Sequence, residues 1–235
     1  MERFLIDAGT GALSINAEAS SGPQHFTILL THLHWDHTLS LPFFGPLYRP
    51  ENRIDFYGHT ADGLGIEDAL EAVMQPPWFP VSFKSAPSDK RFHHLDGDPF
   101  TIAGIEITYS RLFHPQGVTG YRLEKEGAVL VVATDVEHGD PQSDLAVREL
   151  AKGADVLLYD AQYHPSEHQN GKLGWGHSTW QAASSVAVDA GVGRLILTSH
   201  DPGRSDDEVD RILELARQGF PNTDAAYEGM RFTVG

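Results

Sequence analysis

The chain has 235 residues, of which 40% are hydrophobic, and no cysteine, which excludes a disulfide framework. This length allows one sizeable core or two small ones, and because no linker separates two parts of the sequence, we predict a single globular domain over residues 1–235. The net charge of −16 makes the average surface repulsive to a long nucleic acid, whereas a small anion remains compatible with it.

The first residues carry no targeting signal and lead into a short strand. Met1 to Phe4 has no basic stretch followed by an apolar core, and no apolar run approaches membrane-spanning length, so we predict a cytoplasmic protein without a membrane partner. Phe4–Ile6 then reads as a strand that ends in the glycine-rich turn Asp7–Gly11. Without the lysine of a P-loop, this turn is better interpreted as a tight turn in which Asp7 hydrogen-bonds nearby backbone than as a phosphate cradle.

A second strand delivers a cluster of metal-ligand residues. Phe26–Leu30 is a run of apolar and β-branched residues, and α/β sheets place their chemistry at the carboxyl ends of such strands. The loop that follows offers four potential ligands, His32, His34, Asp36 and His37. Imidazole and carboxylate suit zinc best, with iron, manganese or nickel as alternatives. We therefore predict a metal site able to serve two neighbouring ions, in preference to a histidine-rich surface loop.

Three further elements are expected before residue 75. Leu39–Tyr48 predicts a short helix leading to a loop, Arg53–Gly58 a strand and Ile66–Met74 a short amphipathic helix. Three histidines between residues 59 and 94 have no adjacent ligand partner, and we interpret them as one strand-end and two surface histidines: His59, His93 and His94.

The segment Gln75–Pro80 is too rich in proline to be helix interior and predicts a stiff loop. It carries two large aromatic residues, Trp78 and Phe79. They either pin the loop to the core or form a wall or lid beside the metal loop, and the sequence leaves both interpretations open.

The next strands again end in potential ligands. Ile102–Leu112 predicts a hairpin around Gly104, followed directly by Phe113 and His114. Gly127–Ala133 is an almost continuous apolar strand that leads to Asp135. A role for Asp135 as a helix N-cap is disfavoured, because glycine and proline follow and the next helix is expected at Ser143–Lys152.

The last third of the chain repeats the pattern of a strand followed by polar residues. Asp155–Tyr159 predicts a strand ending at Asp160, and Arg194–Thr198 predicts the last buried strand, which precedes His200. Two residues in an intervening polar loop are expected to be exposed to solvent, His164 and His168.

Capping signals predict two helices here. Ser178 and Gln181 form a capping box for a helix at Thr179–Ala190, which places His177 at the positive end of that helix. In the same way, Ser205 and Glu208 predict a final amphipathic helix. That helix covers Asp206–Arg217, and a terminal strand is expected at Ala225–Val234.

The His-x-His-x-Asp-His pattern of residues 32–37 resembles the signature of the metallo-β-lactamase-fold hydrolases, and the later elements match that superfamily in order over almost the whole chain. The resemblance implies an α/β fold, the four-layer αββα sandwich. It also implies that Asp7 supports the metal loop without binding metal. Relatives usually carry one or two more strands before this aspartate, which leaves two expectations: a first sheet that lacks an edge, or a homodimer in which the partner subunit covers that edge.

The resemblance further implies two divalent metal ions, with zinc expected first and Mn²⁺ or Fe²⁺ as alternatives. One ion would be held by His32, His34 and His114. The other would be held by Asp36, His37 and His200. Asp135 would bridge the two ions, with a water or hydroxide between them.

Gly176-His177-Ser178-Thr179, preceded by an acidic residue at the end of the previous strand, is similar to the phosphodiesterase branch of the superfamily. That branch includes ribonuclease Z and the phosphoribosyl cyclic phosphodiesterases, in which this histidine is a general acid oriented by the acidic residue. The catalytic residues implied are His177, Asp160 and Asp36. Ribonuclease Z has glutamate where this chain has the shorter Asp160. The alternative is a histidine that merely precedes an N-cap.

We therefore predict a dinuclear-metal hydrolase that cleaves a small or cyclic phosphodiester by hydroxide attack. A ribonuclease Z proper is disfavoured, because its long tRNA-holding arm has no counterpart here and the charge opposes polymer binding. The first alternative is a lactonase or β-lactamase acting on a carbonyl group. A flavodiiron oxidoreductase is disfavoured because that group has glutamate where His34 stands, and a non-catalytic metal-binding module is the remaining alternative.

Overall fold

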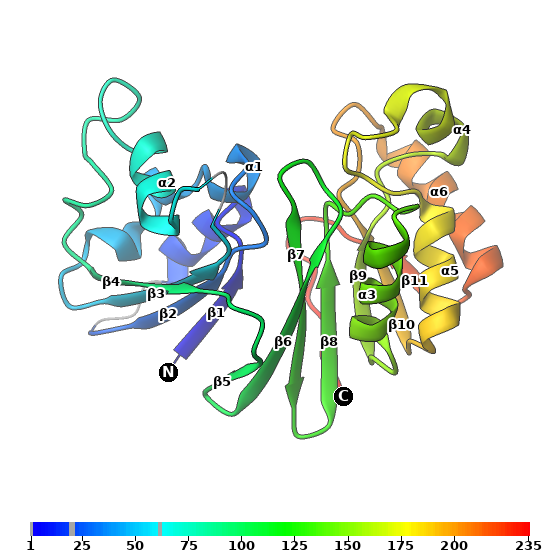
Figure 1. The fold of residues 1–235 in the computed structure, drawn as a ribbon, viewed down its shortest axis with the longest axis horizontal. Coiled ribbons are helices and arrows are strands. Elements are labelled where there is room, and N and C mark those ends of the chain that lie inside the picture. The colour runs from blue at the N-terminus through cyan, green and yellow to red at the C-terminus, as the bar shows by residue number, and fades with distance from the viewer. Residues whose placement is uncertain (1, 19–21, 61–62) are drawn as a thin grey trace. The chain divides into compact units, whose positions relative to one another are not determined.

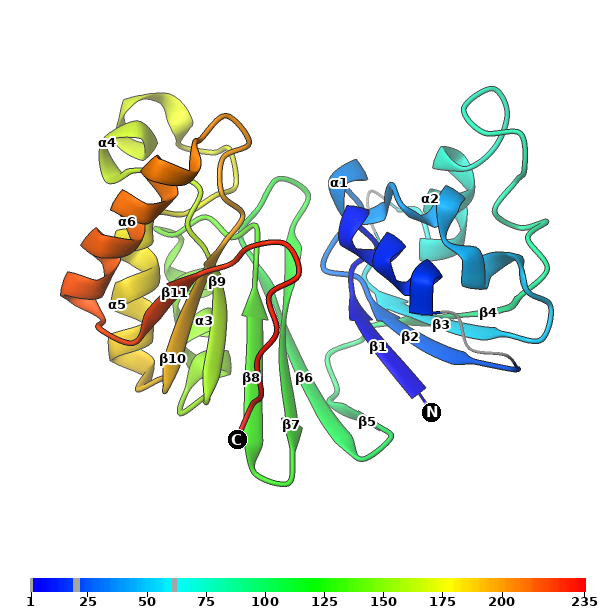
Figure 2. The same cartoon turned by 180° about the vertical axis from the view of Figure 1, so that it is seen from behind.

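The computed structural model describes residues 2–18, 22–60 and 63–235. The chain divides into two compact units, Met1–Asp96 and Gly97–Gly235, and each has one β-sheet with its own hydrophobic core (Figures 1 and 2). This division does not test the prediction of one domain over residues 1–235, which stays a prediction. Within the described ranges, no helix combines the length and the apolar character needed to cross a membrane.

The first unit is built on four parallel strands in the order β1-β2-β3-β4. These strands span Glu2–Ile6, His25–Leu29, Arg53–Gly58 and Asp89–His94. The connections contain the 3₁₀ helices η1 (Thr10–Glu18), η2 (Leu41–Phe43) and η3 (Gly45–Tyr48). They also contain the α-helices α1 (Trp35–Thr38) and α2 (Ile66–Val73). Parallel neighbours need such crossover connections, since a tight turn cannot join them.

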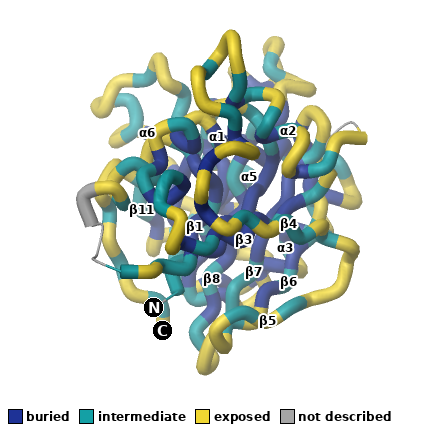
Figure 3. The backbone as a smooth tube through the Cα atoms, turned by 90° about the vertical axis from the view of Figure 1, so that its left-hand side faces the viewer, coloured by how far each residue is buried: buried dark blue, intermediate teal, exposed yellow. Residues whose placement is uncertain are grey.

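The alternation of side chains along the strands decides which residues enter the core of this unit. Every second residue of β2 and β3 is fully buried in one cluster, namely Phe26, Ile28, Ile54 and Phe56. Helix α2 adds Ile66 and Leu70 to the same cluster. Figure 3 shows the resulting pattern, with buried residues in dark blue mainly along the strands and exposed residues in yellow mainly along the loops.

The first unit differs from the sequence-based expectations at two places. Strand β4 was not predicted, since its side chains are mostly polar, yet it pairs with β3 as an edge strand. The side chain of His93 on this strand is 38% exposed, as expected of a surface histidine, but its Nε2 also lies 2.6 Å from Asp55 Oδ1. In place of the short helix and loop predicted at Leu39–Tyr48, this segment forms the two 3₁₀ helices η2 and η3, each of which has a proline in its first turn.

A buried carboxylate joins three strands of this sheet. Asp55 of β3 is 2% exposed and accepts two hydrogen bonds from the guanidinium of Arg53, at 2.6 and 2.8 Å. The Nε2 atoms of His25 and His93 each lie 2.6 Å from one of its oxygens. Burial opposes ionisation of Asp55, but the hydrogen bonds from Arg53, His93 and His25 outweigh it and lower the pKa of the carboxyl.

We expect Asp55→Asn to lower the free energy of unfolding at pH 7 by about 2 kcal/mol, because it removes the charge of a buried carboxylate that accepts hydrogen bonds from the half-exposed Arg53. A carboxyl whose pKa is lower in the folded state stabilises the fold above its unfolded-state pKa and loses this effect as pH falls. The difference from wild type should therefore shrink below about pH 4. Urea unfolding at pH 7 and pH 3 measures both effects.

The matched control is Asp89→Asn, because Asp89 pairs with Arg91 at the same spacing on the next strand but its side chain is 52% exposed. That substitution should change the free energy of unfolding by less than about 1 kcal/mol. Equal unfolding midpoints at pH 7 for wild type and Asp55→Asn would contradict the stabilising role of the cluster.

The second unit is built on seven strands in the order β11-β10-β9-β8-β7-β6-β5. Strands β5 to β8 span Phe100–Ile102, Ile105–Leu112, Val118–Lys125 and Ala128–Ala133. Strands β9 to β11 span Val156–Asp160, Arg194–Thr198 and Thr223–Ala225. The helices α3 (Pro141–Ala151), α5 (Trp180–Ala190) and α6 (Asp206–Gly219) share one core with this sheet. Short helical turns, α4 (Pro165–Glu167) and the π-helical η4 (His168–Lys172), precede α5.

Strand direction brings the functional segments of this unit to the same side of the sheet, where the carboxyl ends of four strands lie. Strand β8 runs parallel to β9, and β9 runs parallel to β10. Strand β6 points the same way as β8, because each is antiparallel to β7 between them. The residues that follow these four strands are therefore delivered to the same edge of the sheet.

Four predictions for the second unit need correction. The terminal strand is not Ala225–Val234 but the shorter β11, and among the described residues no strand follows Ala225. Helix α3 begins two residues early, since Asp140 caps it and proline occupies its first position. The N-cap of α5 is Thr179, which accepts a hydrogen bond from Ala182 N–H, so the predicted capping role of Ser178 is wrong. His168 is buried rather than exposed to solvent.

Candidate functional site

In the first unit, Asp7 holds the predicted metal loop in place. Its Oδ1 accepts the backbone N–H of Thr31 at 2.7 Å, and its Oδ2 accepts the Thr31 hydroxyl at 2.7 Å. The same Oδ2 lies 2.7 Å from Nδ1 of His37, which orients that ring and places its Nε2 3.3 Å from Asp36 Oδ2. The Asp7 side chain thus hydrogen-bonds the backbone of the metal loop, 24 residues away, rather than the nearby backbone that was predicted, and it also contacts a potential ligand.

The three imidazoles of this loop converge. The ring of His32 lies 4.4 Å from the ring of His34 and 4.2 Å from the ring of His37, measured between centroids. His32 Nε2 and His34 Nδ1 are 2.9 Å apart. Three imidazoles beside one carboxylate, that of Asp36, are a donor set that suits a divalent cation such as zinc.

A close approach of two backbone segments explains one glycine of the turn before this loop. A Cβ on Gly9 would lie 2.5 Å from the carbonyl oxygen of Asp36. The neighbouring Ala8 donates its N–H to the carbonyl of His37 at 2.7 Å. The turn and the metal loop are thus joined through backbone atoms, and glycine is required where they meet.

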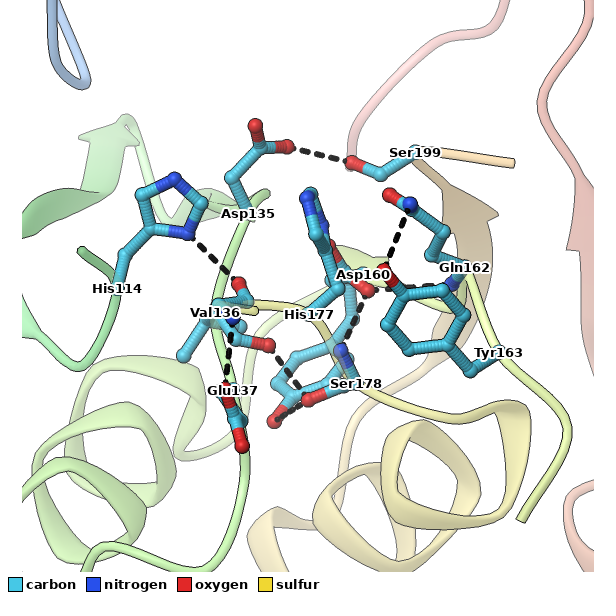
Figure 4. A network of polar contacts seen from close by, with 12 residues as sticks. His114, Asp135, Val136, Glu137, Asp160, Gln162, Tyr163, His177, Ser178 and Ser199 are labelled. Carbon is cyan, nitrogen blue, oxygen red and sulfur yellow. Dashed lines mark hydrogen bonds and ion pairs between the residues drawn. The ribbon is translucent and has the colours of Figure 1, made fainter. Parts of the chain in front are cut away.

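In the second unit, His177 and Asp160 form a close pair (Figure 4). Nδ1 of His177 lies 2.6 Å from Asp160 Oδ2, so the shorter aspartate does reach the histidine. The other oxygen of Asp160 accepts the backbone N–H groups of Ser178 at 2.7 Å and Gln162 at 3.1 Å. Asp160 is fully buried, and this burial raises its pKa to about 6, against the opposing effect of His177.

A second histidine of this unit is oriented by backbone. Nδ1 of His114 lies 2.7 Å from the carbonyl oxygen of Gly176 and donates its hydrogen to it. This contact leaves Nε2 as the nitrogen that can bind a metal ion. The His114 ring lies edge-on to His177, with centroids 5.4 Å apart.

Glu137 holds the loop that contains Gly176 and His177, and sequence reasoning did not identify this glutamate. Its side chain is buried and accepts the N–H groups of Gly174 and Gly176, each at 2.7 Å. The buried His168 lies against the same carboxylate, with Nε2 3.3 Å from Oε1. An acidic residue two positions after Asp135 was the available signal, but its partners lie 37 and 39 residues further along the chain.

The remaining predicted residues follow β8 and β10. Asp135 has φ +53° and accepts the Ser199 hydroxyl at 2.8 Å (Figure 4). Ligand atoms of Asp135, Asp160 and His177 lie within 4.8 Å of one another. His200 is not in this group, and both of its ring nitrogens are buried without a hydrogen-bond partner in the described part of the chain. Burial lowers the pKa of His200, which favours the neutral imidazole that binds metals.

The sequence and the fold are similar to those of known proteins. A family model described as a beta-lactamase superfamily domain matches residues 2–200. Ribonuclease Z of Methanothermobacter thermautotrophicus is 29% identical over 292 residues, which covers 99% of this chain and 88% of that protein. An uncharacterized protein of Mycobacterium leprae is 32% identical over 213 residues, which covers 88% of this chain and 70% of that protein.

A solved structure supports the fold. A metallo-beta-lactamase fold protein from Bacillus subtilis has a TM-score of 0.72 to this chain, at 19% identity, with 97% of this chain and 85% of that chain covered. The predicted fold is confirmed by this likeness, and the prediction of a hydrolytic enzyme is confirmed at the level of the family. The chain belongs to the beta-lactamase superfamily.

Proposed function

We propose that this protein is a metal-dependent phosphodiesterase that hydrolyses a small or cyclic phosphodiester, with His177 as the general acid. The observation that carries this proposal is the 2.6 Å contact between His177 and the fully buried Asp160. A histidine oriented by a carboxylate suits a reaction whose leaving oxygen needs a proton. The relative named ribonuclease Z is, by its name, an enzyme that acts on RNA, whose backbone is a phosphodiester.

The charge of the chain supports a small substrate over a polymer. With a net charge of −16, the average surface repels a polyanion, while a single phosphodiester can still be drawn to bound cations. The location in the cytoplasm stays a prediction.

The proposed metal ligands come from both units. One ion would be held by His32, His34 and His114, and the other by Asp36, His37 and His200, with Asp135 as the bridging carboxylate. The convergent imidazoles of the first unit, and the buried ring nitrogens of His200 in the second, fit such a role. Divalent ions bound there, Zn²⁺ being expected before Mn²⁺ or Fe²⁺, supply a water nucleophile of lowered pKa and neutralise charge on the phosphoryl oxygens.

The side chains of the second unit then handle the proton. Asp160 holds the Nδ1–H of His177, so the proton that reaches the leaving oxygen departs from Nε2. The N–H groups of Ser178 and Gln162 stabilise the carboxylate, which stays paired with the imidazole before and after the transfer. A carboxylate partner favours imidazolium and the N-terminus of α5 disfavours it, so the two effects oppose each other in setting the acid strength.

The experiment is hydrolysis of bis(p-nitrophenyl) phosphate by protein that has been stripped of metal and reconstituted with Zn²⁺ or Mn²⁺. Turnover should appear with metal and disappear on chelation. Full metal occupancy with no phosphodiester turnover would overturn the proposal. Hydrolysis of a lactone or a β-lactam by the same sample would then favour the carbonyl alternative, and no turnover of any substrate would favour the non-catalytic one.

Metal binding should depend on the glycine at which the turn meets the metal loop. Gly9→Ala places a Cβ against the Asp36 carbonyl, so the loop must shift, and we expect zinc affinity to fall by about 10- to 100-fold. Gly11→Ala is the control, since a Cβ there meets nothing within 4 Å. Calorimetric titration of zinc into the stripped proteins gives the comparison, and equal affinities for the two variants would contradict the role of Gly9.

A homodimer is the proposed state in solution. Among the described residues, strand β1 pairs only with β2, so its outer edge offers backbone groups to a second copy. Light scattering that shows a stable monomer would remove this proposal.

A further inference from the structure

An apolar cavity of about 490 Å³ adjoins the metal loop of the first unit. Ten residues line it, all between positions 35 and 78, and Thr38 is the only one of them with a polar side chain. The size is typical of a site for a small molecule or for part of one, and no charged side chain lines it among the described residues. Its occupant is therefore expected to be uncharged and apolar.

Two tryptophans at this cavity have large exposed surfaces. The exposed fraction is 72% for Trp35 and 75% for Trp78, and both line the cavity. Exposed indole rings contribute little to a core, whereas they bind flat rings well through stacking and edge-on contacts. The walls of the cavity thus present the surface that an aromatic ligand needs.

The loop that carries Trp78 does not need this residue for its anchorage. Phe79 packs against the core of the first unit and lies edge-on to Phe43, with ring centroids 5.6 Å apart. The backbone N–H groups of Trp78 and Phe79 both donate to the carbonyl of Gln75 at 2.9 Å. Of the two interpretations of this loop, attachment to the core applies to Phe79, whereas Trp78 forms part of the cavity wall.

The cavity and the metal loop have a residue in common. Trp35 stands between His34 and Asp36 and is the first residue of α1. Thr38, which also lines the cavity, donates its hydroxyl to the His34 carbonyl at 3.2 Å. The cavity and the proposed ligands His34 and Asp36 therefore share one short segment of the first unit.

We propose that this cavity binds a flat aromatic group of the substrate, so that the enzyme selects phosphodiesters that carry an aromatic ring. The inference rests on the proposed function for the identity of the group that lies at the metal loop. Within the cavity, Trp35 and Trp78 provide the aromatic contacts and the aliphatic side chains of α2 exclude water.

Binding of phosphonates to the metal-loaded protein tests the proposal without requiring turnover. Phenylphosphonate and methylphosphonate differ only in the apolar group, and we expect the phenyl compound to bind about 10-fold more tightly to wild type. This preference should fall to about 2-fold or less in Trp35→Ala and Trp78→Ala, while affinity for inorganic phosphate stays within about 2-fold of wild type. Trp78→Phe should retain most of the preference because it keeps a ring.

Tyr227→Ala is the matched control, since Tyr227 is an aromatic residue of the second unit that is 69% exposed. It should leave the preference unchanged. Absence of a preference in wild type, or its persistence in both tryptophan variants, would overturn the proposal. Equal binding of hexylphosphonate and phenylphosphonate would also overturn it, by showing a site for alkyl chains. A tryptophan-dependent preference without phosphodiester turnover would keep the aromatic site and reject the proposed function.

Discussion

Replacement of His177 by alanine is expected to slow hydrolysis of a cyclic ribose phosphodiester by about 10²- to 10⁴-fold, the usual contribution of a general acid. The leaving oxygen of such a substrate is an alkoxide, which needs a proton as the bond to phosphorus breaks. Nitrophenolate departs as a stable anion, so the loss on bis(p-nitrophenyl) phosphate should be much smaller. The ratio of the two losses in kcat, measured on metal-loaded protein, is the quantity to determine.

Asp160→Asn is the companion variant, because it keeps the size of the side chain and removes the charge that holds the His177 ring. It should show the same substrate dependence with a smaller loss. The metal content of both variants must match wild type, since a change in occupancy would lower both rates alike. Equal losses on the two substrates, at equal metal content, would show that His177 acts otherwise than as an acid.

Gly176→Ala should abolish most activity, with a fall in kcat of about 10²-fold or more. A Cβ at this position would lie 2.2 Å from Nδ1 of His114 and 2.4 Å from Cδ of Pro115, and Gly176 also has φ +90°. The hydrogen bond from His114 to the Gly176 carbonyl cannot survive that contact, and misplacement of the proposed ligand His114 by about 1 Å can cost about 10²-fold. We also expect the free energy of unfolding to fall by about 2–3 kcal/mol.

The chain offers a close control in Gly174→Ala. Gly174 has φ +81° and donates its N–H to the same Glu137 carboxylate, but a Cβ there meets nothing within 4 Å. This variant should lose about 1 kcal/mol of stability from backbone strain and retain most of its activity. Thermal melts, metal content and kcat, measured for Gly176→Ala and Gly174→Ala, distinguish the effect of backbone strain from the effect of displacing His114. Similar activity losses in both would reject the specific contact.

Sequence reasoning located well the strands whose own apolar residues are the ones that become buried. The strand at Arg53–Gly58 was placed with its observed bounds, as was the one at Arg194–Thr198. Ser205 and Glu208 form the predicted capping box, because both hydrogen bonds are local to one turn. Local chemistry of this kind can be read directly from neighbouring residues.

The errors arose where a distant partner decided the outcome. The Ser178 oxygen accepts the backbone N–H of His138 at 3.1 Å, and its hydroxyl donates to the carbonyl of Val136 at 2.6 Å. Ser178 is thus engaged with the segment after β8, and Thr179 caps α5. Strand β4 has a polar sequence and forms because β3 offers an unpaired edge and a buried aspartate for His93. A single sequence does not specify such pairings.

The candidate site also contains both kinds of feature, those visible in neighbouring residues and those set by distant partners. Its first half was visible as six consecutive residues, 32–37, whereas Asp160 and His177 lie 17 residues apart and were linked through a family resemblance. Glu137 was overlooked because nothing in its own neighbourhood indicates the loop that it holds. The contacts of Glu137 with Gly174 and Gly176 exist only once β8 and the segment before α5 lie side by side.

The common direction of β6, β8, β9 and β10 also determines where the second unit can be altered. Their amino ends, and the tight turn that joins β7 to β8, lie at the edge of the sheet opposite to His177. That turn consists of Glu126 and Gly127, both at positive φ, and a Cβ on Gly127 would meet nothing within 4 Å. A fluorophore or an affinity tag inserted there would report on the enzyme, or immobilise it, at a distance from the chemistry.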